Sequence, residues 1–264
     1  MGIINMTPDS FSGDGLYRRI NLRPALRYAR KLISDGADIL DIGGESTRPG
    51  AQRISVKEEI DRVIPLITRL AKKISVPISI DTYKPEVARR ALEAGACIVN
   101  NIMGTRCDKS LLRMVRDYKA AIVLMHIKGT PRTMQQNIRY GNLMEELFSS
   151  LRKSLENCLE SGINSDRIIL DPGIGFGKTS DHNLEIINRL DRLKRLNKPL
   201  LVGSSRKSFI GKILNKEVHD RLWGSAASVC ASILNGAHIV RVHDVRPMKD
   251  VALVADAIMN KKTS

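Results

Sequence analysis

Charged and polar side chains recur where short apolar runs of this sequence end. Asp41, Asp81 and Asp171 each end one such run, and Arg241 ends another near the C-terminus. A carboxylate held rigidly at the end of a strand can accept hydrogen bonds from the N–H-rich edge of a heterocycle. We expect Asp81 and Asp171 to do this. The other residues of the set, each following an apolar run, are Asn5, Asp9, Asn100, Asn101, His126, Lys207 and His243.

A second set of residues is suited to binding an anion such as a diphosphate. Its members are basic, namely Arg48, Arg206, Lys207, Arg241 and His243. The planar guanidinium of arginine matches the spacing of phosphate oxygens, and hydrogen bonds between charged partners are the stronger kind. Together the two sets indicate displacement of a phosphorylated leaving group from a heterocyclic substrate.

Several familiar catalytic motifs are absent. The run Gly173–Thr179 resembles a phosphate-binding loop, but Pro172 stands where a P-loop needs its first glycine, so we expect the glycines to allow close approach of a ligand. There is no nucleophile elbow, no H-E-x-x-H and no C-x-x-C pair among the four cysteines. Serine nucleophiles, zinc hydrolysis and redox motifs are therefore unsupported.

The elements that must position these residues repeat along the chain. A helical pattern ends in Gly-Ala and leads directly into an apolar run at Gly36–Ala37, Gly95–Ala96 and Gly236–Ala237, with a looser copy at Gly162. Glycine at such a point favours the left-handed conformation that ends a helix, and the run after it indicates a buried strand. The predicted strands are 2–5, 38–42, 78–81, 97–102, 121–126, 167–171, 200–203 and 239–243.

Amphipathic helices are predicted between these strands. Ser55 and Glu58 form a capping-box pattern, while Pro85 and Asp108 are helix-start signals. Eight strands alternating with helices in about 250 residues indicate a (β/α)8 TIM barrel, an α/β fold, in a single domain over residues 1–264. A doubly wound open sheet is the alternative, because a strand count alone does not establish closure.

Three further features have structural interpretations. For His126, a core histidine with its hydrogen bonds satisfied is at least as strongly expected as a functional group at a strand end. Trp223 is expected to anchor a late helix in the core. The run Arg189–Lys198 is expected to form a helix with a solvated basic face.

Composition limits the class of protein. The chain has 264 residues, of which 42% are hydrophobic, and a net charge of +15 that attracts anions. No apolar run approaches the roughly 18–20 residues that span a bilayer, and scattered cysteines suit a reducing cytosol. With 4% aromatic residues and no recognition motif, nucleic-acid binding is not expected. We expect a cytoplasmic protein that binds neither membrane nor nucleic acid.

Seven long motifs carry a family resemblance over nearly the whole chain. They are MGIINMTPDSFS (1–12), GGESTRPGA (43–51), SIDTYKPEVA (79–88), LMHIKGTPRTMQ (124–135), ILDPGIGFGKT (169–179), LLVGSSRKSFIG (200–211) and IVRVHDV (239–245). In these the sequence resembles the dihydropteroate synthases of folate biosynthesis, which are targets of sulfonamides. The resemblance implies a (β/α)8 barrel that condenses 4-aminobenzoate with dihydropterin-methyl diphosphate through a dissociative step. It also implies Mg²⁺ and a homodimer.

The resemblance also assigns roles to residues of this chain. It implies that the pterin is held by Asp81, Asn100, Asp171 and Lys207. It implies that Asn5 binds Mg²⁺ and the diphosphate, which Arg48, Arg241 and His243 also contact. The 4-aminobenzoate site would be lined by Thr47, Pro49, Phe176, Lys207 and Ser208, with Phe11 closing over it.

The sequence departs from the family pattern in two motifs and at its start. Asn101 replaces the usual aspartate after Asn100, and Gly13-Asp14-Gly15 replaces Asp-Gly-Gly. The usual lead-in segment is missing, which suggests a trimmed chain or part of a fusion. Two alternatives remain open. One is a pterin-binding barrel of the methyltransferase kind, which Thr47–Pro49 and Ser205–Ser208 disfavour. The other is a degenerate pterin binder.

Overall fold

The computed structural model describes residues 1–7, 22–46, 52–130 and 133–261. The strands of this part are β1 (Gly2–Asn5), β2 (Leu40–Gly43), β3 (Ile78–Asp81), β4 (Ile98–Asn101), β5 (Ala121–Met125), β6 (Ile168–Asp171), β7 (Leu201–Val202) and β8 (Ile239–Val240). The α-helices are α2 (Leu22–Ser34), α3 (Val56–Ala71), α4 (Pro85–Glu93), α5 (Lys109–Asp117), α6 (Leu143–Glu160), α7 (Ser180–Asn188), α8 (Ser208–Leu214), α9 (Leu222–Leu234) and α10 (Val245–Asn260). Strands and helices alternate as predicted.

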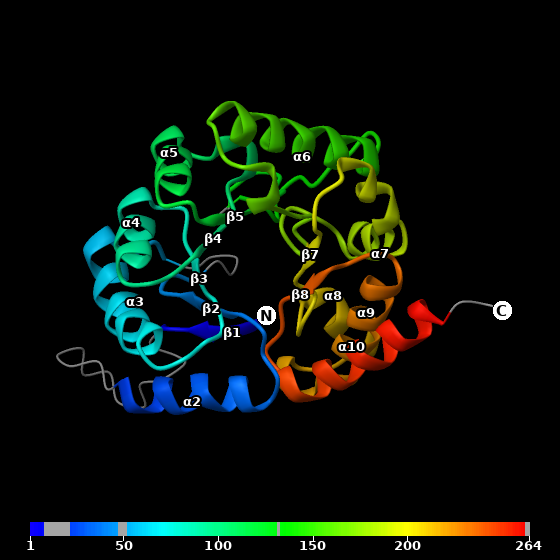
Figure 1. Cartoon of the computed structure of the whole chain (residues 1–264). Coiled ribbons are helices and arrows are strands. Elements are labelled where there is room, and N and C mark those ends of the chain that lie inside the picture. The colour runs from blue at the N-terminus through cyan, green and yellow to red at the C-terminus, as the bar shows by residue number, and fades with distance from the viewer. Residues whose placement is uncertain (8–21, 47–51, 131–132, 262–264) are drawn as a thin grey trace.

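The strands close into a ring. Strands β1 to β6 form one parallel sheet in chain order, and β7 pairs with β8 in a second parallel sheet. Single bridges join the two sheets, Leu170 with Leu200 on one side and Gly2 with Val242 on the other. The Val242 N–H also donates to the Met1 carbonyl at 2.9 Å. The closed ring, surrounded by helices in Figure 1, is the predicted barrel and excludes the open doubly wound sheet.

The barrel interior is apolar at one level and polar at the next. Met1, Ile98, Val123 and Leu201 form a buried cluster, against which pack Ile39, Ala121, Ile169 and Ile239. Side chains two residues apart on a strand share a face. Each of Ile39, Ile98, Ile169 and Ile239 is therefore followed on the inner face by a polar residue, namely Asp41, Asn100, Asp171 and Arg241. These polar residues lie toward the carboxyl ends of the strands.

Most of the predicted helix signals are confirmed. The Ser55 hydroxyl accepts a hydrogen bond from the Glu58 N–H at 3.1 Å, and Asp108 caps α5 by accepting from the Ser110 N–H at 2.7 Å. The reciprocal half of the capping box does not form, because the Glu58 carboxylate pairs with Arg62 at 2.5 Å. At the Gly-Ala junctions the glycines have positive φ, for example +110° at Gly95, as expected for a helix terminus.

Three local predictions differ from the structure. Trp223 is 75% exposed, not buried, because α9 packs through small serines together with Val229 and Ile233. The basic run has the expected exposed basic face, with Arg192, Lys194 and Arg195 exposed, but it forms a 3₁₀-helix over Leu190–Leu196. Every third residue of this helix is a buried leucine, as its three-residue turn requires. Strand β8 ends at Val240, and beyond it the His243 N–H donates to the Ser205 hydroxyl at 3.3 Å.

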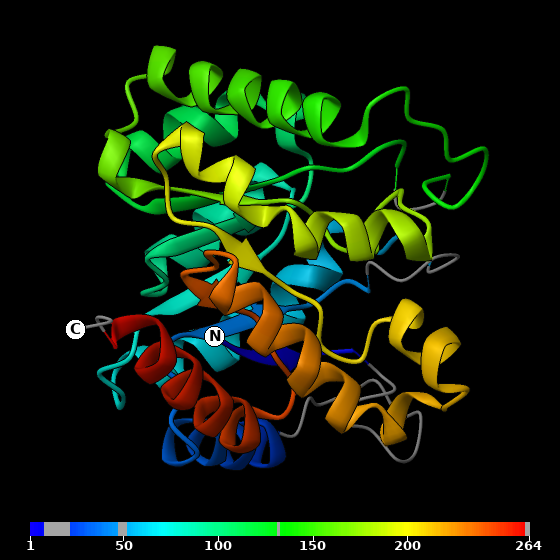
Figure 2. The same cartoon turned by 90° about the vertical axis from the view of Figure 1, so that its right-hand side faces the viewer.

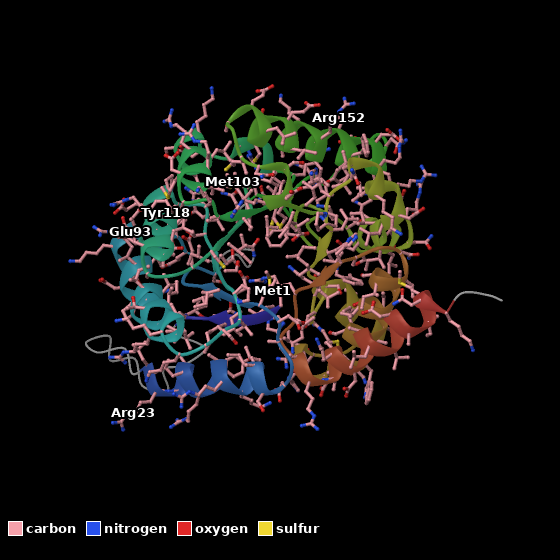
Figure 3. All side chains as sticks on the ribbon, in the orientation of Figure 1. Met1, Arg23, Glu93, Met103, Tyr118 and Arg152 are labelled. Atoms are coloured by element: carbon pink, nitrogen blue, oxygen red, sulfur yellow. The ribbon has the colours of Figure 1, made fainter. Side chains whose placement is uncertain are left out.

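The outer surface is covered by the helices. Charged side chains such as Arg23, Glu93 and Arg152 lie at the periphery in Figure 3, whereas Met1 lies near the middle of the ring. Figure 2 shows α8 at one end of the barrel and the C-terminal end of α10 at the other. Among the described helices, none has the length and apolarity needed to cross a membrane.

Candidate active site

Arg241 directly follows β8, and its guanidinium group bonds side chains from two other strands, β2 and β3. Its Nε donates to Asp41 Oδ2 at 2.6 Å, and its Nη2 donates to Asp81 Oδ2 at 2.8 Å. The same Asp41 oxygen accepts from Asn100 Nδ2 at 3.1 Å. The barrel thus brings together Asp81, Asn100 and Arg241, three of the residues predicted to form the site. Burial raises the pKa of Asp81, against the opposing attraction of Arg241.

Asp41, for which no role was predicted, is the side chain that bonds both Asn100 and Arg241. Its side chain is fully buried, and Oδ2 accepts from both Asn100 and Arg241. Its Oδ1 is buried with no hydrogen-bond partner among the described residues. The sequence signal was its place two residues after Ile39, which puts it inside the barrel rather than in a loop. Asp41 therefore fixes the Asn100 amide and the Arg241 guanidinium relative to each other.

Asp171 faces the same interior from the end of β6. Its Oδ1 accepts from the Gly173 N–H at 2.6 Å, and its side chain is buried. Burial raises the pKa of Asp171 to about 6, while the Gly173 hydrogen bond and the positive charge of Lys207 oppose the rise. The carboxylate is thus ionised at neutral pH and can accept hydrogen bonds from a donor-rich ligand.

Lys207 reaches the site from the start of α8. Its ammonium lies 4.3 Å from the centre of the Phe176 ring, a cation–π contact. Its aliphatic stem crosses Gly175, where an added Cβ would lie 3.1 Å from Lys207 Cδ. Burial lowers the pKa of Lys207 to about 8, against the attraction of Asp171 and Asp81. Phe176 and Lys207 therefore come together as predicted.

The second basic set is only partly assembled at this site. His243 Nδ1 lies 3.1 Å from Ser205 Oγ, and burial lowers the pKa of His243 to about 4, so the imidazole is neutral at pH 7. Arg206 pairs with Asp244, because its Nε donates to that carboxylate at 2.9 Å and its Nη2 donates to it as well. That Arg206 binds an anion stays a prediction.

Other predicted site residues differ in how far the structure describes them. Asn5 is half-buried at the end of β1, and Ser208 is exposed at the start of α8. Thr47, Arg48 and Pro49 lie outside the described residues, as do Phe11 and the Gly13–Gly15 departure.

Lys84 secures the chain on either side of residues 47–51. Its ammonium donates to Glu45 Oε2 at 2.5 Å, to Glu59 Oε2 at 2.7 Å and to the Ile54 carbonyl at 2.8 Å. The Tyr83 hydroxyl also donates to Glu45, at 3.1 Å. The segment between Glu45 and Ile54 is therefore anchored at both ends beside β3.

Asn101, the departure from the family pattern, is fully buried at the end of β4. Its Oδ1 accepts from the Met103 N–H at 2.7 Å, and its Nδ2 has no hydrogen-bond partner among the described residues. A carboxylate oxygen could accept the same hydrogen bond. The substitution thus preserves the turn and leaves the contacts of Asn100 intact.

The comparisons with known proteins agree over almost the whole chain. The model of the family described as "Pterin binding enzyme" matches residues 1–243. A dihydropteroate synthase of Synechocystis is 48% identical over 98% of this chain and 89% of the relative. One from Bacillus subtilis is 45% identical over 99% of this chain and 88% of the relative.

Solved structures match in the same way. A sulfonamide complex of the Yersinia pestis dihydropteroate synthase has a TM-score of 0.91 at 39% identity, covering 98% of this chain and 93% of that one. The Clostridium difficile enzyme, solved in the presence of pteroic acid, has a TM-score of 0.91 at 42% identity, covering 98% and 96%. The Xanthomonas albilineans enzyme with 4-aminobenzoic acid has a TM-score of 0.91 at 38% identity, covering 99% and 93%.

Proposed function

Since the chain belongs to the pterin-binding enzyme family and is a transferase of the dihydropteroate synthase type, we propose how its site carries out that reaction. The reaction condenses 4-aminobenzoate with (7,8-dihydropterin-6-yl)methyl diphosphate and yields dihydropteroate and diphosphate. The observation that carries the assignment of residues is the meeting of Asp81, Asn100, Asp171 and Lys207 at one end of the barrel. A pterin edge rich in N–H donors matches two carboxylates and an amide held on rigid strands.

Asp81, Asn100, Asp171 and Lys207 bind the pterin in this proposal. Asp81 and Asp171 accept from ring N–H groups, and Asn100, fixed by its bond to Asp41 at 3.1 Å, presents its amide oxygen. Lys207 donates to an acceptor of the pterin ring. Lys207 and Phe176, which contact each other, both contact 4-aminobenzoate as well. Thr47, Pro49, Phe176, Lys207 and Ser208 line the 4-aminobenzoate side. The related Xanthomonas albilineans structure contains 4-aminobenzoic acid, which supports this molecule as the second substrate.

The diphosphate is bound by Arg48, Arg241 and His243. Arg241 uses Nε and Nη2 for the two aspartates, which leaves its Nη1 amino group for phosphate oxygens. We assign the His243 proton to Nε2, because Nδ1 then accepts from the Ser205 hydroxyl and Nε2–H faces an anion. Donors fixed in place stabilise negative charge as it develops on the leaving group.

Bond breaking comes first in the proposed order of events. The C–O bond to the diphosphate breaks as Arg241 and His243 stabilise the departing oxygens. The aromatic amine then attacks the pterin methylene carbon, which forms the C–N bond, and the amine nitrogen loses one proton to solvent. Asp81 and Asp171 stabilise the transient positive charge on the pterin. Such a route needs a well-positioned amine rather than a strong base. It requires no covalent nucleophile from this chain.

Mg²⁺ fits the donor set through Asn5. Within the described residues no group of three or more His, Cys, Asp or Glu side chains could hold a metal by itself. Mg²⁺ commonly combines one or two protein oxygens with substrate phosphates and waters, and the amide oxygen of Asn5 at the end of β1 suits that pattern. When bound, the ion would offset charge on the diphosphate.

Product formation tests this function directly. The full-length chain, given Mg²⁺ and both substrates, is expected to form dihydropteroate, detected by its mass. We expect a sulfonamide to compete with 4-aminobenzoate, in line with the sulfonamide complex of the Yersinia pestis relative. Binding of the pterin without product would instead favour a methyltransferase-type or degenerate site.

The affinity of the site for a pterin is expected to fall in acid. Burial raises the pKa of Asp171 to about 6, so the carboxylate is ionised above that pH and loses its full acceptor capacity below it. Burial raises the pKa of Asp81 as well, so the dissociation constant of 6-hydroxymethylpterin should rise as the pH falls and the two carboxylates are protonated. Calorimetric titration at several pH values measures this. Asp171→Asn should remove the inflection near pH 6 and leave the part due to Asp81, whereas a pH profile identical to that of the wild type would contradict the assignment to Asp171.

We also propose a homodimer formed through α9 and α10. These helices lie side by side in Figure 2 and expose Trp223, Leu253, Val254 and Ile258, each at least 58% accessible. Large exposed apolar side chains on two neighbouring helices are typical of an interface. We further propose that the protein acts in the cytoplasm. We propose that residues 1–264 form a single pterin-binding domain, and that neither nucleic acid nor a membrane is a partner.

Light scattering tests the dimer. The chain should have twice its mass of 29.4 kDa, and Leu253→Lys with Val254→Lys should shift it toward the monomer. The matched control is Leu159→Lys on α6, a leucine that is 43% exposed away from this face. A monomeric wild-type chain would contradict the proposal.

A further inference from the structure

Lys178 is a buried lysine at the end of the glycine-rich loop that follows β6. Its side chain is almost inaccessible, and its ammonium lies 3.0 Å from His126 Nδ1 and 3.3 Å from the His126 carbonyl. The third contact is with the Phe176 carbonyl, at 2.9 Å. One ammonium thus joins the loop that carries Phe176 to the end of β5.

Burying the Lys178 ammonium in this way costs folding free energy that an apolar side chain of similar size would not cost. A buried ammonium without a bonded carboxylate loses hydration, and burial lowers the pKa of Lys178 to about 7. Asp171 opposes this shift, whereas the charge of Lys207 adds to it. The facing imidazole is neutral, since burial and the charges of Lys178 and Lys128 lower the pKa of His126 to about 2. His126 is therefore an acceptor for Lys178, as expected of a satisfied core histidine.

The two ends of this loop are held by different contacts. Asp171 is fixed by strand pairing, by the His126 N–H bonding to its carbonyl at 2.9 Å, and by the Gly173 N–H on its carboxylate. Phe176 lies further along, where Lys178 bonds its carbonyl and Lys207 covers its ring. The glycines on either side of Phe176 have their own contacts, Gly175 with Asn183 and Gly177 with Tyr140. Removing the Lys178 ammonium should therefore displace the Phe176 carbonyl locally and leave Asp171 in place.

We propose that Lys178 is a positioning residue for the 4-aminobenzoate side of the site, acting by fixing the Phe176 carbonyl to the end of β5 together with His126. The inference rests on the proposed function, because the role of Phe176 does. It predicts a selective effect. The second substrate loses its binding surface, while the pterin retains Asp81, Asn100 and Asp171.

The test uses Lys178→Met, which keeps the length of the side chain and removes the ammonium. At pH 7, where Asp171 is mostly ionised and a substantial fraction of Lys178 is protonated, the KM for 4-aminobenzoate should rise about tenfold, since small displacements of positioning groups can cost up to about two orders of magnitude. The dissociation constant of 6-hydroxymethylpterin should stay within about twofold. Lys198→Met is the matched control, because Lys198 also bonds a carbonyl, that of Ser165 at 3.0 Å, but before β6.

A second variant and a second readout make the test independent of turnover. His126→Phe removes one acceptor, and its effect should not add to that of Lys178→Met, because both act on the same contact. Amide hydrogen exchange in a peptide spanning residues 173–179 should become faster in either variant, but not in Lys198→Met. If Lys178→Met does not fold, His126→Phe alone gives the same two readouts.

The outcomes separate the inference from the proposed function. An unchanged KM for 4-aminobenzoate and unchanged exchange in a folded variant would overturn the role of Lys178. Equal losses in the binding of the pterin and of 4-aminobenzoate would show a general structural role and would also overturn it. If the wild-type chain forms no dihydropteroate, the proposed function fails, whereas faster exchange in Lys178→Met would still establish the contact between the loop and β5.

Discussion

Replacing Lys207 with methionine is expected to lower kcat/KM by about 100- to 1000-fold, the usual loss when one fixed donor is removed from a reacting centre. In the proposed site Lys207 contacts both substrates, and its stem crosses Gly175 while its ammonium lies 4.3 Å from the centre of the Phe176 ring. Methionine keeps the stem and loses the charge. Both the pterin dissociation constant and the turnover should therefore suffer.

The matched control is Lys212→Met, an exposed lysine on the same helix, α8. It should leave kinetics and binding within about twofold of the wild type, since exposed surface substitutions away from special features have small effects. Steady-state rates with each substrate varied in turn give the measurement. Unchanged kinetics in Lys207→Met would remove Lys207 from the site, whatever happened to the control.

Replacing Arg241 with methionine is expected to have two separable effects. Asp41 and Asp81 lose the cation that bonds them at 2.6 and 2.8 Å, and Asp41 is fully buried. Removing one partner from a buried ion pair typically destabilises a protein by about 3–5 kcal/mol. The diphosphate also loses a donor, so the KM for the pterin diphosphate should rise far more than the dissociation constant of a pterin without phosphates.

A double variant distinguishes the two effects. Adding Asp41→Asn to Arg241→Met removes the buried charge that was left uncompensated, so denaturant unfolding should recover much of the lost stability. Turnover should not recover, because the diphosphate donor is still missing. Recovery of both would mean that Arg241 acts only through the fold, and equal losses for phosphorylated and unphosphorylated pterins would contradict its contact with the diphosphate.

The sequence was most informative where a local rule and the barrel geometry agree. Gly-Ala junctions mark helix ends followed by buried strands, and these positions recur with positive φ at Gly36, Gly95 and Gly236. Strand ends carry the predicted Asp81, Asn100, Asp171 and Arg241, because alternation places each above the apolar interior. The number of strands did not establish that the barrel closes, because closure depends on two bridges, Gly2 with Val242 and Leu170 with Leu200, between distant segments.

The missed features depend on contacts between residues far apart in the chain. Asp41 bonds Arg241 across 200 positions of sequence, and Lys178 meets His126 across 52. No local pattern reports such pairs. The pairing of Arg206 with Asp244 was missed for the same reason, because Asp244 lies 38 residues away. Trp223 was misplaced because large aromatic residues are usually buried, whereas the serines of α9 occupy the packed face instead.

Diphosphate release with and without the amine tests the central claim most directly. The full chain would be supplied with Mg²⁺ and dihydropterin-methyl diphosphate, and diphosphate and dihydropteroate would be measured together in each reaction. We expect release that yields one dihydropteroate for each diphosphate, and only when 4-aminobenzoate is present. Pterin binding without any dihydropteroate in the presence of 4-aminobenzoate would contradict the assignment of this chain as a dihydropteroate-forming transferase.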